Sequence, residues 1–403
     1  MNDGRSTSLL DGFTALDLSG NEGQFVGRLL ADLGMRVIKV EPPSGDTVRN
    51  VGPFRDDLID HESSLRFAFL NGGKESITLN LETADGLAMF LELVSHVDVL
   101  IESFRPGYLD SLDIGFPRLH EHNPRLVVAS ISPFGQNGPR ANYLATDIVG
   151  VAMGGIMFIS GDPGLPPVRP PETQSFYYAS IYTTYAVLLA LFQRGETGVG
   201  QHIDISIQES VASQEHMIRE AAFDGVQITR NGSQHKHTAP ANIFPCTDGY
   251  VYLFILGARD WDRLLSLWTD HPVELDASEL KAPGVRRANA AMINPLVEQF
   301  TSRFSKRELM SHLQGNGIPC LPVNSPRDFL NEEQVHVREF FGDVESRALG
   351  RYQAPRFPAL FDGERPPVAG PPPELGADSA AIYHEWLGLD AAELELLAAR
   401  GVV

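Results

Sequence analysis

Short apolar strands alternate with helical patterns through the first third of the chain, and this alternation limits the fold more than any other feature. The expected strands are Ala15–Leu18, Arg36–Val40, Ile77–Leu81, Val97–Ile101 and Leu126–Ile131, and helical patterns lie between them at Phe25–Leu33, Thr83–Ser95 and Leu112–His120. Strands separated by helices of this length predict a parallel, doubly wound sheet, that is, a Rossmann-like α/β fold.

The loops that follow these strands predict where a ligand would bind. In a doubly wound sheet the ligand crevice lies at the carboxyl ends of the strands. The loops leaving those ends are Gly20–Gln24, Glu41–Asp46, Ser103–Gly107 and Ser132–Arg140. They are rich in Gly and Pro, as a close approach of backbone to ligand requires. The glycine pattern GxGxxG is absent from the first loop, which disfavours a nicotinamide dinucleotide.

A long apolar segment follows the predicted sheet. Phe176–Phe192 is apolar or aromatic on every face, which predicts a helix buried on all sides. A proline-rich loop carries Glu172 to its N-terminus, where the helix dipole favours an anion. We therefore expect a reactive carboxylate or a bound thioester at this point. An alternating strand follows at Ile203, Ile205 and Ile207.

Composition limits the class of partner. With 403 residues, the chain is too long for one ordinary core and predicts two or three domains. The formal net charge of −20 argues against nucleic acid or an anionic membrane as the main partner. Cys246 and Cys320 are too few for a disulfide framework, and the first residues lack a signal-peptide pattern. We expect a cytoplasmic protein.

Two short motifs have ordinary structural explanations. Asn71-Gly72-Gly73-Lys74 lacks the earlier glycine of a P-loop, so it is interpreted either as a turn before a strand or as an anion contact through Lys74. His235 and His237 have no third ligand at a recognisable spacing, which favours solvated loop residues over a metal site. A GxSxG motif is absent, so a serine esterase has no support.

Three acids stand in loops on the predicted ligand side of the sheet. They are Glu22 in the first loop, Asp147 before a run of small residues, and Glu172. Each is a candidate general acid, general base or nucleophile. For Asp147 a helix N-cap is a strong alternative, because Asp is favoured there.

The order of several motifs resembles the family III CoA-transferases, the CaiB/BaiF group. The matching stretches include LDLSGNEGQFVGRLLADLGMRVIKVEPPSGD, LNGGKESITLNLETADG, VDVLIESFRPGYLDSLDIGF, TDIVGVAMGG and RGETGVGQHIDISIQE, and the similarity extends over nearly the whole chain. Formyl-CoA transferase, carnitine CoA-transferase and 2-methylacyl-CoA racemase belong to this group.

The resemblance implies an architecture and a ligand. It implies a large Rossmann-like domain from residues 1–223, a linker and small domain in 224–335, and a return to the large domain in 336–403. It implies an interlocked homodimer that binds an acyl-CoA thioester as substrate and needs no tightly bound cofactor and no metal. The CoA contacts that it implies are Lys39, Leu70, Asn71, Gly72, Gly73, Lys74, Ser103, Phe104, Arg105 and Thr146.

The chain departs from the family pattern at the reactive positions. The resemblance implies an aspartate nucleophile near the start of the buried helix, and that position falls at Ser175 or Phe176, with Glu172 the nearest acid. The histidine of the racemase branch is replaced by Thr146, and the transferase glutamine of the first loop by Glu22.

These departures leave three hypotheses. The first is CoA transfer between an acyl-CoA and a carboxylic acid, with Glu172 as the nucleophile. The second is isomerase, racemase or lyase chemistry, in which Asp147 with Glu22 removes a proton next to the thioester. The third is a CoA-binding protein without catalysis, or a subunit paired with a competent paralogue. The aromatic run Phe176–Tyr178 suggests a larger apolar acyl group, although core packing explains it equally well.

Overall fold

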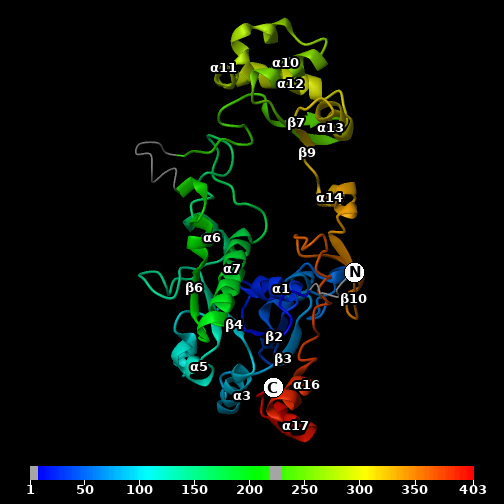
Figure 1. The fold of residues 1–403 in the computed structure, drawn as a ribbon. Helices are drawn as coiled ribbons and strands as arrows, with labels where there is room; N and C mark the ends of the chain where they lie inside the picture. The colour runs from blue at the N-terminus through cyan, green and yellow to red at the C-terminus, as the bar shows by residue number, and fades with distance from the viewer. Residues whose placement is uncertain (1–7, 218–227) are drawn as a thin grey trace. The chain divides into compact units, whose positions relative to one another are not determined.

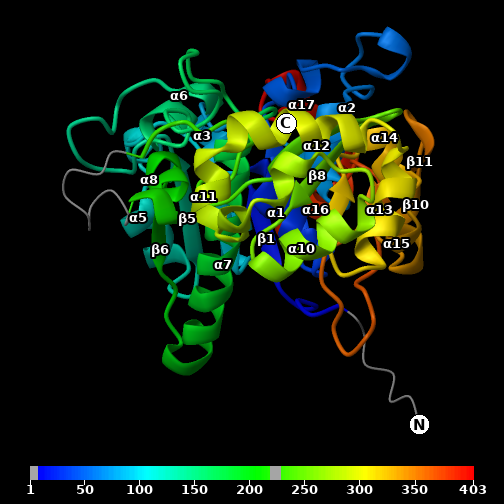
Figure 2. The same cartoon turned by 90° about the horizontal axis from the view of Figure 1, so that it is seen from above.

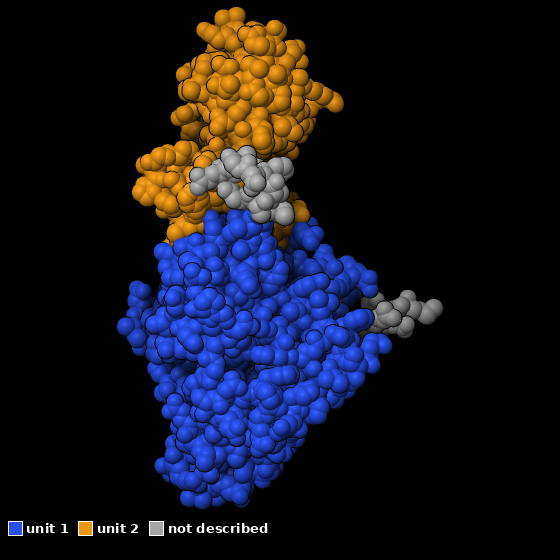
Figure 3. All heavy atoms as spheres, turned by 90° about the vertical axis from the view of Figure 1, so that its left-hand side faces the viewer, with its two compact units in different colours: residues 1–156, 170–222, 336–403 blue, residues 157–169, 223–335 orange. Residues whose placement is uncertain are grey.

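The computed structural model describes residues 8–217 and 228–403. They form two compact units, which Figure 3 shows in different colours. Unit 1 takes its residues from 1–156, 170–222 and 336–403, and unit 2 from 157–169 and 223–335. Each unit has its own sheet and its own hydrophobic core.

A six-stranded sheet organises unit 1 (Figure 1). Its strands are β1 (Thr14–Asp17), β2 (Arg36–Glu41), β3 (Glu75–Thr78), β4 (Val99–Glu102), β5 (Val127–Ser132) and β6 (His202–Ser206). All neighbouring strands are parallel, and their order is β3-β2-β1-β4-β5-β6. This is the Rossmann order, with its switch point between β1 and β4. The predicted doubly wound α/β fold is confirmed.

Helices cover both faces of this sheet. They are α1 (Gln24–Asp32), α2 (Leu65–Asn71), α3 (Ala84–Ser95), α4 (Tyr108–Ser111), α5 (Phe116–His122), α6 (Asp147–Met153), α7 (Gln174–Thr197) and α8 (Ile207–Ala212), with short 3₁₀ turns at Thr47–Asn50 and Arg55–Asp57. One core packs Leu16 and Leu100 against Phe90 of α3, and the other packs Ala15 and Val99 against α1 and α7. The two cores use alternate strand residues, as the period of a strand requires.

Helix α7 corrects one expectation about burial. Its buried face includes Ala179 and Val187, which pack on β5 and β6, and Figure 2 shows α7 and β6 side by side. The opposite face is not buried, since Tyr185 is 62% and Phe192 76% exposed. The prediction of a helix buried on all sides is therefore wrong for the single chain, because unit 1 covers only one side of it. By length and composition alone α7 could cross a membrane, but half of its apolar window is buried within the protein.

The C-terminal segment completes unit 1. It contains part of α15 (Glu333–Val337), a hairpin of β10 (Phe341–Ser346) and β11 (Gly350–Pro355), an irregular proline-rich tail, α16 (Ser379–Leu387) and α17 (Ala391–Ala399). The Tyr383 hydroxyl donates to the Thr78 carbonyl at 2.6 Å, and the Asn80 amide donates to the Val402 carbonyl at 2.7 Å. These bonds fix the last residues of the chain beside β3.

Unit 2 is built on an antiparallel sheet. Its strands are β7 (Ala241–Cys246), β8 (Gly249–Phe254) and β9 (Cys320–Pro322), and its helices are α10 (Ala258–Leu267), α11 (Pro283–Ala288), α12 (Ala290–Thr301), α13 (Lys306–Gln314) and α14 (Pro326–Leu330), with 3₁₀ turns at Val273–Asp276 and Ser278–Lys281. Trp261, Trp268 and Phe300 fill its core. The sequence did not predict β7 or the β10–β11 hairpin, since Pro245 and Pro355 obscure the strand pattern in both regions.

After β6, the structure differs from the sequence-based expectation at two points. Ile207, expected at the end of the strand, begins α8 because the Ser206 side chain caps that helix by accepting from the Glu209 amide. The helix expected at Gln208–Ala222 ends at Ala212, and the last residues of the expected range lie outside the described part of the chain.

Candidate functional site

A crevice of about 680 Å³ opens at the carboxyl ends of β1 to β4, where the sheet order predicts a ligand. Its lining comes from the loops after these strands and includes Glu22, Pro42, Ser44, Leu79, Ser103, Phe104 and Tyr108. Phe104 packs against Tyr108, with ring centroids 4.7 Å apart. The crevice therefore offers an aromatic wall and polar loops to a ligand.

Two crevice loops are joined by side-chain bonds. The Ser103 hydroxyl accepts from the Gly20 amide at 2.8 Å, which ties the loop after β4 to the loop after β1. Glu102, the last residue of β4, accepts from the Phe104 amide at 2.7 Å. Burial raises the pKa of Glu102 to about 7, against the opposing effect of its bond with Ser130. The position of Phe104 thus depends on a buried carboxyl group.

Lys39 and Lys74, which the resemblance implies as CoA contacts, are buried and bonded within the protein. The Lys74 ammonium donates to Asp17 Oδ2, the Gln24 carbonyl and Asn71 Oδ1 at 2.7–2.8 Å. These three bonds use all of its protons. The Lys39 ammonium lies 2.8 Å from Asp46 Oδ2 and also donates to a backbone carbonyl. In this conformation Lys74 has no proton left for a phosphate, and Lys39, which is 1% exposed, uses two of its three protons on Asp46 and the Ser19 carbonyl.

The pKa values of the two lysines respond differently to this burial. Burial lowers the pKa of Lys74 to about 8, although Asp17 opposes the change. For Lys39 the carboxylates of Asp46 and Asp17 outweigh the effect of burial and hold its pKa above the usual value. Both ammonium groups are therefore part of a buried charge network beneath the first loop.

The predicted contacts Leu70 and Asn71 end α2, and Gly72 and Gly73 form the turn that follows it beside the C-terminal tail. Leu70, Asn71 and Gly72 are buried, and the Gly73 amide donates to the Pro371 carbonyl at 3.0 Å. A Cβ on Gly73 would lie 2.7 Å from Ala369, so a side chain there has no room. Among the predicted contacts, Ser103 and Phe104 line the crevice, and Arg105 follows them as an exposed residue.

Glu22 faces the crevice from the first loop. Burial raises its pKa, the nearby Asp46 raises it further, and Arg66 lowers it. Because burial disfavours the charged form of a carboxyl, Glu22 keeps its proton to a higher pH than a free glutamate does.

Asp147 and Ser175 meet at the N-terminus of α7. Asp147 is 6% exposed, and its Oδ1 accepts from both the amide and the hydroxyl of Ser175, at 2.9 and 2.8 Å. The Thr173 side chain at the N-cap of α7 makes no capping bond, so Asp147 caps this helix from α6. The N-cap of α6 is Thr146. Asp147, for which the sequence suggested an N-cap, therefore caps α7 instead of its own helix. The second oxygen of Asp147, Oδ2, is buried without a hydrogen-bond partner among the described residues.

Glu172 lies one residue before the N-cap of α7. Its side chain is exposed, and its φ of 58° places it in the left-handed region, which non-glycine residues rarely adopt. Such backbone strain is concentrated at functional sites. Glu172 precedes α7 and Asp147 caps it from α6, and the structure shows no hydrogen bond between these two side chains.

Arg66 was not singled out from the sequence, yet it connects the two candidate loops. Its Nε and Nη2 donate to Asn21 Oδ1 at 2.9 and 2.7 Å, and Nη2 also donates to Thr173 Oγ1 at 3.1 Å. Arg66 lies on α2, so three separate elements meet at the N-terminus of α7. A single arginine in SSLRFAFL gives no sequence pattern that would have revealed this role.

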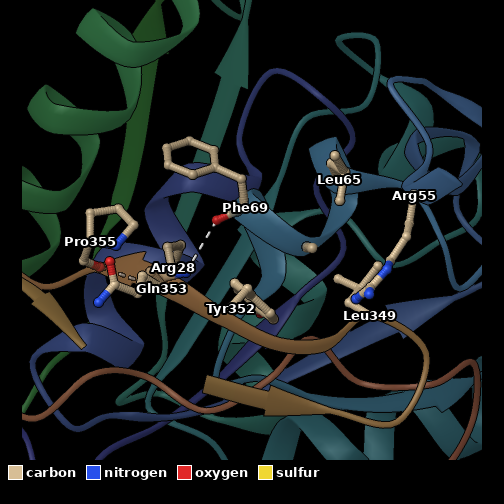
Figure 4. A pocket seen from close by; sticks show the side chains of 10 residues that line it. Arg28, Arg55, Leu65, Phe69, Leu349, Tyr352, Gln353 and Pro355 are labelled. Atoms are coloured by element: carbon tan, nitrogen blue, oxygen red, sulfur yellow. Dashed lines mark hydrogen bonds between the residues drawn. The ribbon is translucent and has the colours of Figure 1, made fainter. Parts of the chain in front are cut away.

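A second hollow, of about 250 Å³, lies between α2 and the β10–β11 hairpin (Figure 4). Arg28, Arg55 and Tyr352 contribute its polar atoms. The Arg28 guanidinium is already bonded to Asp32 and to the carbonyls of Phe69 and Pro355. This arginine therefore holds α1, α2 and β11 together and leaves the hollow without an open charge on that side.

The histidine pair lies in unit 2. The rings of His235 and His237 are 5.7 Å apart, and the His237 amide donates to the ring of His235. Over residues 8–217 and 228–403, no group of three or more His, Cys, Asp or Glu side chains is placed to hold a metal ion.

Comparisons with known proteins agree on one family. The model of CoA-transferase family III matches residues 10–379. Two similar relatives are succinyl-CoA:(R)-benzylsuccinate CoA-transferase subunit BbsE of Thauera aromatica, 30% identical with 97% of each chain covered, and succinyl-CoA--D-citramalate CoA-transferase of Chloroflexus aurantiacus, 32% identical with 94% of each covered. The crystal structure of a CaiB/BaiF family protein from Brucella suis matches with a TM-score of 0.85 and 29% identity, covering 95% of this chain and 100% of that one.

Proposed function

The chain belongs to CoA-transferase family III, and we propose that it transfers CoA from an acyl-CoA to a carboxylic acid through the carboxylate of Glu172. The enzyme class agrees with the first hypothesis drawn from the sequence. The observation that carries the choice of Glu172 is its place: it is exposed, directly before the N-cap of α7. The positive end of that helix dipole stabilises an anion there.

The proposed reaction has two symmetrical halves. The Glu172 carboxylate attacks the thioester carbonyl, and the C–S bond breaks. CoA leaves as a thiolate, and the acyl group stays on Glu172 as a mixed anhydride. The thiolate then attacks the Glu172 carbonyl carbon, which releases the donor acid and leaves Glu172 as a CoA thioester. The acceptor carboxylate attacks this thioester and forms a second anhydride. The released thiolate attacks the acceptor carbonyl, which gives the new acyl-CoA and restores the carboxylate.

The crevice at β1 to β4 is proposed to hold the CoA moiety. Phe104 supplies an aromatic face, and the exposed Arg105 beside it is available to a phosphate. Glu22, whose side chain lines the crevice, is proposed to lie beside the thioester and, when protonated, to donate a hydrogen bond to its oxygen. Coenzyme A enters as part of the substrate in this scheme, and the reaction calls for no resident cofactor.

The substrate class follows from the relatives. Two similar relatives are named for succinyl-CoA, whose acyl group ends in a free carboxylate. We propose a dicarboxylic acyl group as one substrate of this chain, in place of the larger apolar acyl group that the aromatic run suggested.

Trapping the covalent intermediate tests the choice of nucleophile. The protein is incubated with a panel of acyl-CoAs, quenched with hydroxylamine or borohydride, and analysed by intact mass and peptide mapping. Modification of Glu172 is the expected result. Modification of another carboxylate, or transfer without any covalent species, would refute the role of Glu172.

A second candidate role belongs to Asp147, because its buried Oδ2 has no hydrogen-bond partner within residues 8–217 and 228–403. If Asp147 acted as a base with Glu22, the chemistry would be proton removal next to the thioester. Incubation of an acyl-CoA in D2O separates the two: deuterium at the acyl α-carbon without exchange of CoA between acids would favour Asp147. Transfer without deuterium uptake is the expected result.

The assembly is proposed to be an interlocked homodimer in the cytoplasm. The exposed apolar residues of α7 border a groove of about 540 Å³ that Phe25, Leu29, Tyr185, Leu188 and Phe357 help to line. A second copy of the chain would cover these side chains. One relative is named as a subunit, so a paralogue is the competing partner. Light scattering on the purified chain should give the mass of a dimer, and a stable monomer would contradict the proposal.

A further inference from the structure

Arg66 differs from the other partly or fully buried arginines near the sheet of unit 1. Arg28 is paired with Asp32 at 2.9 Å, and Arg49 lies 2.7–2.8 Å from Glu41 and Glu62. The described acceptors of Arg66 are a neutral amide and a neutral hydroxyl. Its charge is therefore not neutralised by a hydrogen-bonded carboxylate in the described part of the chain.

The guanidinium of Arg66 also keeps unused donors. The hydrogen bonds to Asn21 and Thr173 come from Nε and Nη2, and Nη1 has no acceptor among residues 8–217 and 228–403. These three bonds hold the side chain in a fixed orientation between two loops. A guanidinium fixed in this way loses little further conformational freedom when it binds a ligand.

The charges around Arg66 indicate what kind of ligand it would bind. Its positive charge lowers the pKa of Glu22, so the two side chains interact across the first loop. Glu172 precedes Thr173, and Asp147 bonds to the first turn of the same helix. An acid substrate that approaches these carboxylates meets repulsion, which a nearby cation offsets.

We propose that Arg66 binds the free carboxylate of a dicarboxylic acyl group during CoA transfer. Three of the five guanidinium protons are donated to Asn21 and Thr173, so the two N–H groups of Nη1 are the donors left for a carboxylate. This role rests on the proposed function and names the residue that selects its substrate class. It makes Arg66 a specificity-determining residue, with the chemistry left to the carboxylate at the start of α7.

A purely structural role is the competing explanation, because Arg66 ties Asn21 to Thr173. A loop tie would affect all substrates alike. A carboxylate contact affects only those substrates that carry a second carboxylate. Two acyl-CoAs of equal chain length therefore separate the explanations: succinyl-CoA, with a terminal carboxylate, and butyryl-CoA, with a methyl group in its place.

The experiment compares Arg66→Gln with Asn21→Ala, each checked for folding by thermal unfolding. Arg66→Gln removes the charge together with the tie, whereas Asn21→Ala removes the bond to Asn21 and keeps the charge, so a loss found only in Arg66→Gln is due to the charge. For Arg66→Gln we expect KM for succinyl-CoA to rise about 10- to 100-fold, the range for a lost charge-assisted hydrogen bond, and KM for butyryl-CoA to change by about 2-fold at most. For Asn21→Ala we expect a smaller change that is equal for the two substrates.

Two results would overturn the proposal: an equal loss with both acyl-CoAs in Arg66→Gln, or the same substrate-dependent loss in Asn21→Ala. If the wild-type protein transfers CoA to none of the acids tested, the proposed function fails. Calorimetric titration with the two acyl-CoAs then still tests the role of Arg66. Tighter binding of succinyl-CoA that disappears in Arg66→Gln would support the carboxylate contact. Equal binding of both by the wild type would overturn it.

Discussion

The floor of the crevice and the N-terminus of α7 are both rich in charge, but they differ in how completely their polar groups are bonded. Beneath the first loop, Lys74 uses its three protons on protein acceptors, and Arg49 is paired with two carboxylates. At the N-terminus of α7, Asp147 has one oxygen for which the described part of the chain provides no partner, and Glu172 is exposed. A fully bonded buried network fixes a structure, whereas unused donors and acceptors are available to a ligand.

This contrast separates the residues that the family resemblance implied from those that the geometry favours. Lys39 and Lys74 belong to the buried, bonded groups beneath the first loop, the closed network, which holds Ser19 and that loop. The groups around the N-terminus of α7 form the open region. Arg66 and Glu172 belong to the open region. Substitutions in the closed network should therefore reduce stability, and substitutions in the open region should reduce activity.

The largest expected effect is the loss of the nucleophile. Glu172→Ala should lower the rate of CoA transfer by about 1,000-fold or more, because the covalent route is removed. Glu196→Ala, an exposed acid near the other end of α7, is the matched control and should retain normal rates. Initial rates with succinyl-CoA measure both. Near-normal transfer by Glu172→Ala would assign the chemistry to another carboxylate.

The closed network is tested by Lys74→Met. The substitution leaves Asp17 buried without its cation, which should reduce the free energy of unfolding by about 3–5 kcal/mol. Chemical denaturation measures the loss, and the double variant Asp17→Asn with Lys74→Met should recover part of it. A variant of normal stability that no longer binds CoA would show that Lys74 contacts the ligand after all.

Glu102 makes stability depend on pH in a defined direction. Its pKa is raised from 4.5 to about 7 by burial, so between these values the folded chain holds a proton that the unfolded chain has released. The free energy of unfolding should therefore fall as pH rises from about 4.5 through 7, by an amount on the order of 1–3 kcal/mol. Urea titrations at several pH values measure this fall for the wild type and Glu102→Gln, in which the contribution should disappear. An unchanged pH profile in Glu102→Gln would show that another group is responsible.

The fold was predictable from the sequence because its signals are local and repeated. The first strands are short apolar runs separated by helical patterns, so a parallel, doubly wound sheet follows from general rules of connection. The β10–β11 hairpin and β7 were missed because Pro355 ends β11 at the start of a proline-rich tail and Pro245 lies within β7. The exposed face of α7 was missed because composition does not reveal whether a second chain covers an apolar surface.

The site was only partly predictable, because its contacts join residues far apart in the chain. Glu22, Asp147 and Glu172 were recognisable as acids in loops on the ligand side. The bond between Asp147 and Ser175 spans 28 residues, and that between Arg66 and Thr173 spans 107. Arg66 lies in a short helix with no motif around it, so only the folded chain brings it to Thr173.

The smallest expected effect concerns the hydrogen bond from the Ser175 hydroxyl to Asp147, which joins α7 to α6. Ser175→Ala removes the hydroxyl donor to Asp147 Oδ1 and keeps the backbone donor, so the free energy of unfolding should fall by about 1 kcal/mol. Ser180→Ala is the matched control, because its buried hydroxyl has no partner among the described residues and its removal should cost less. Denaturation measures stability, and initial rates measure transfer. Because Ser175 holds Asp147 and not Glu172, the rate should fall less than 10-fold if Glu172 is the nucleophile. A fall in the transfer rate of much more than 10-fold, with a loss of only about 1 kcal/mol in the free energy of unfolding, would assign the catalytic role to Asp147.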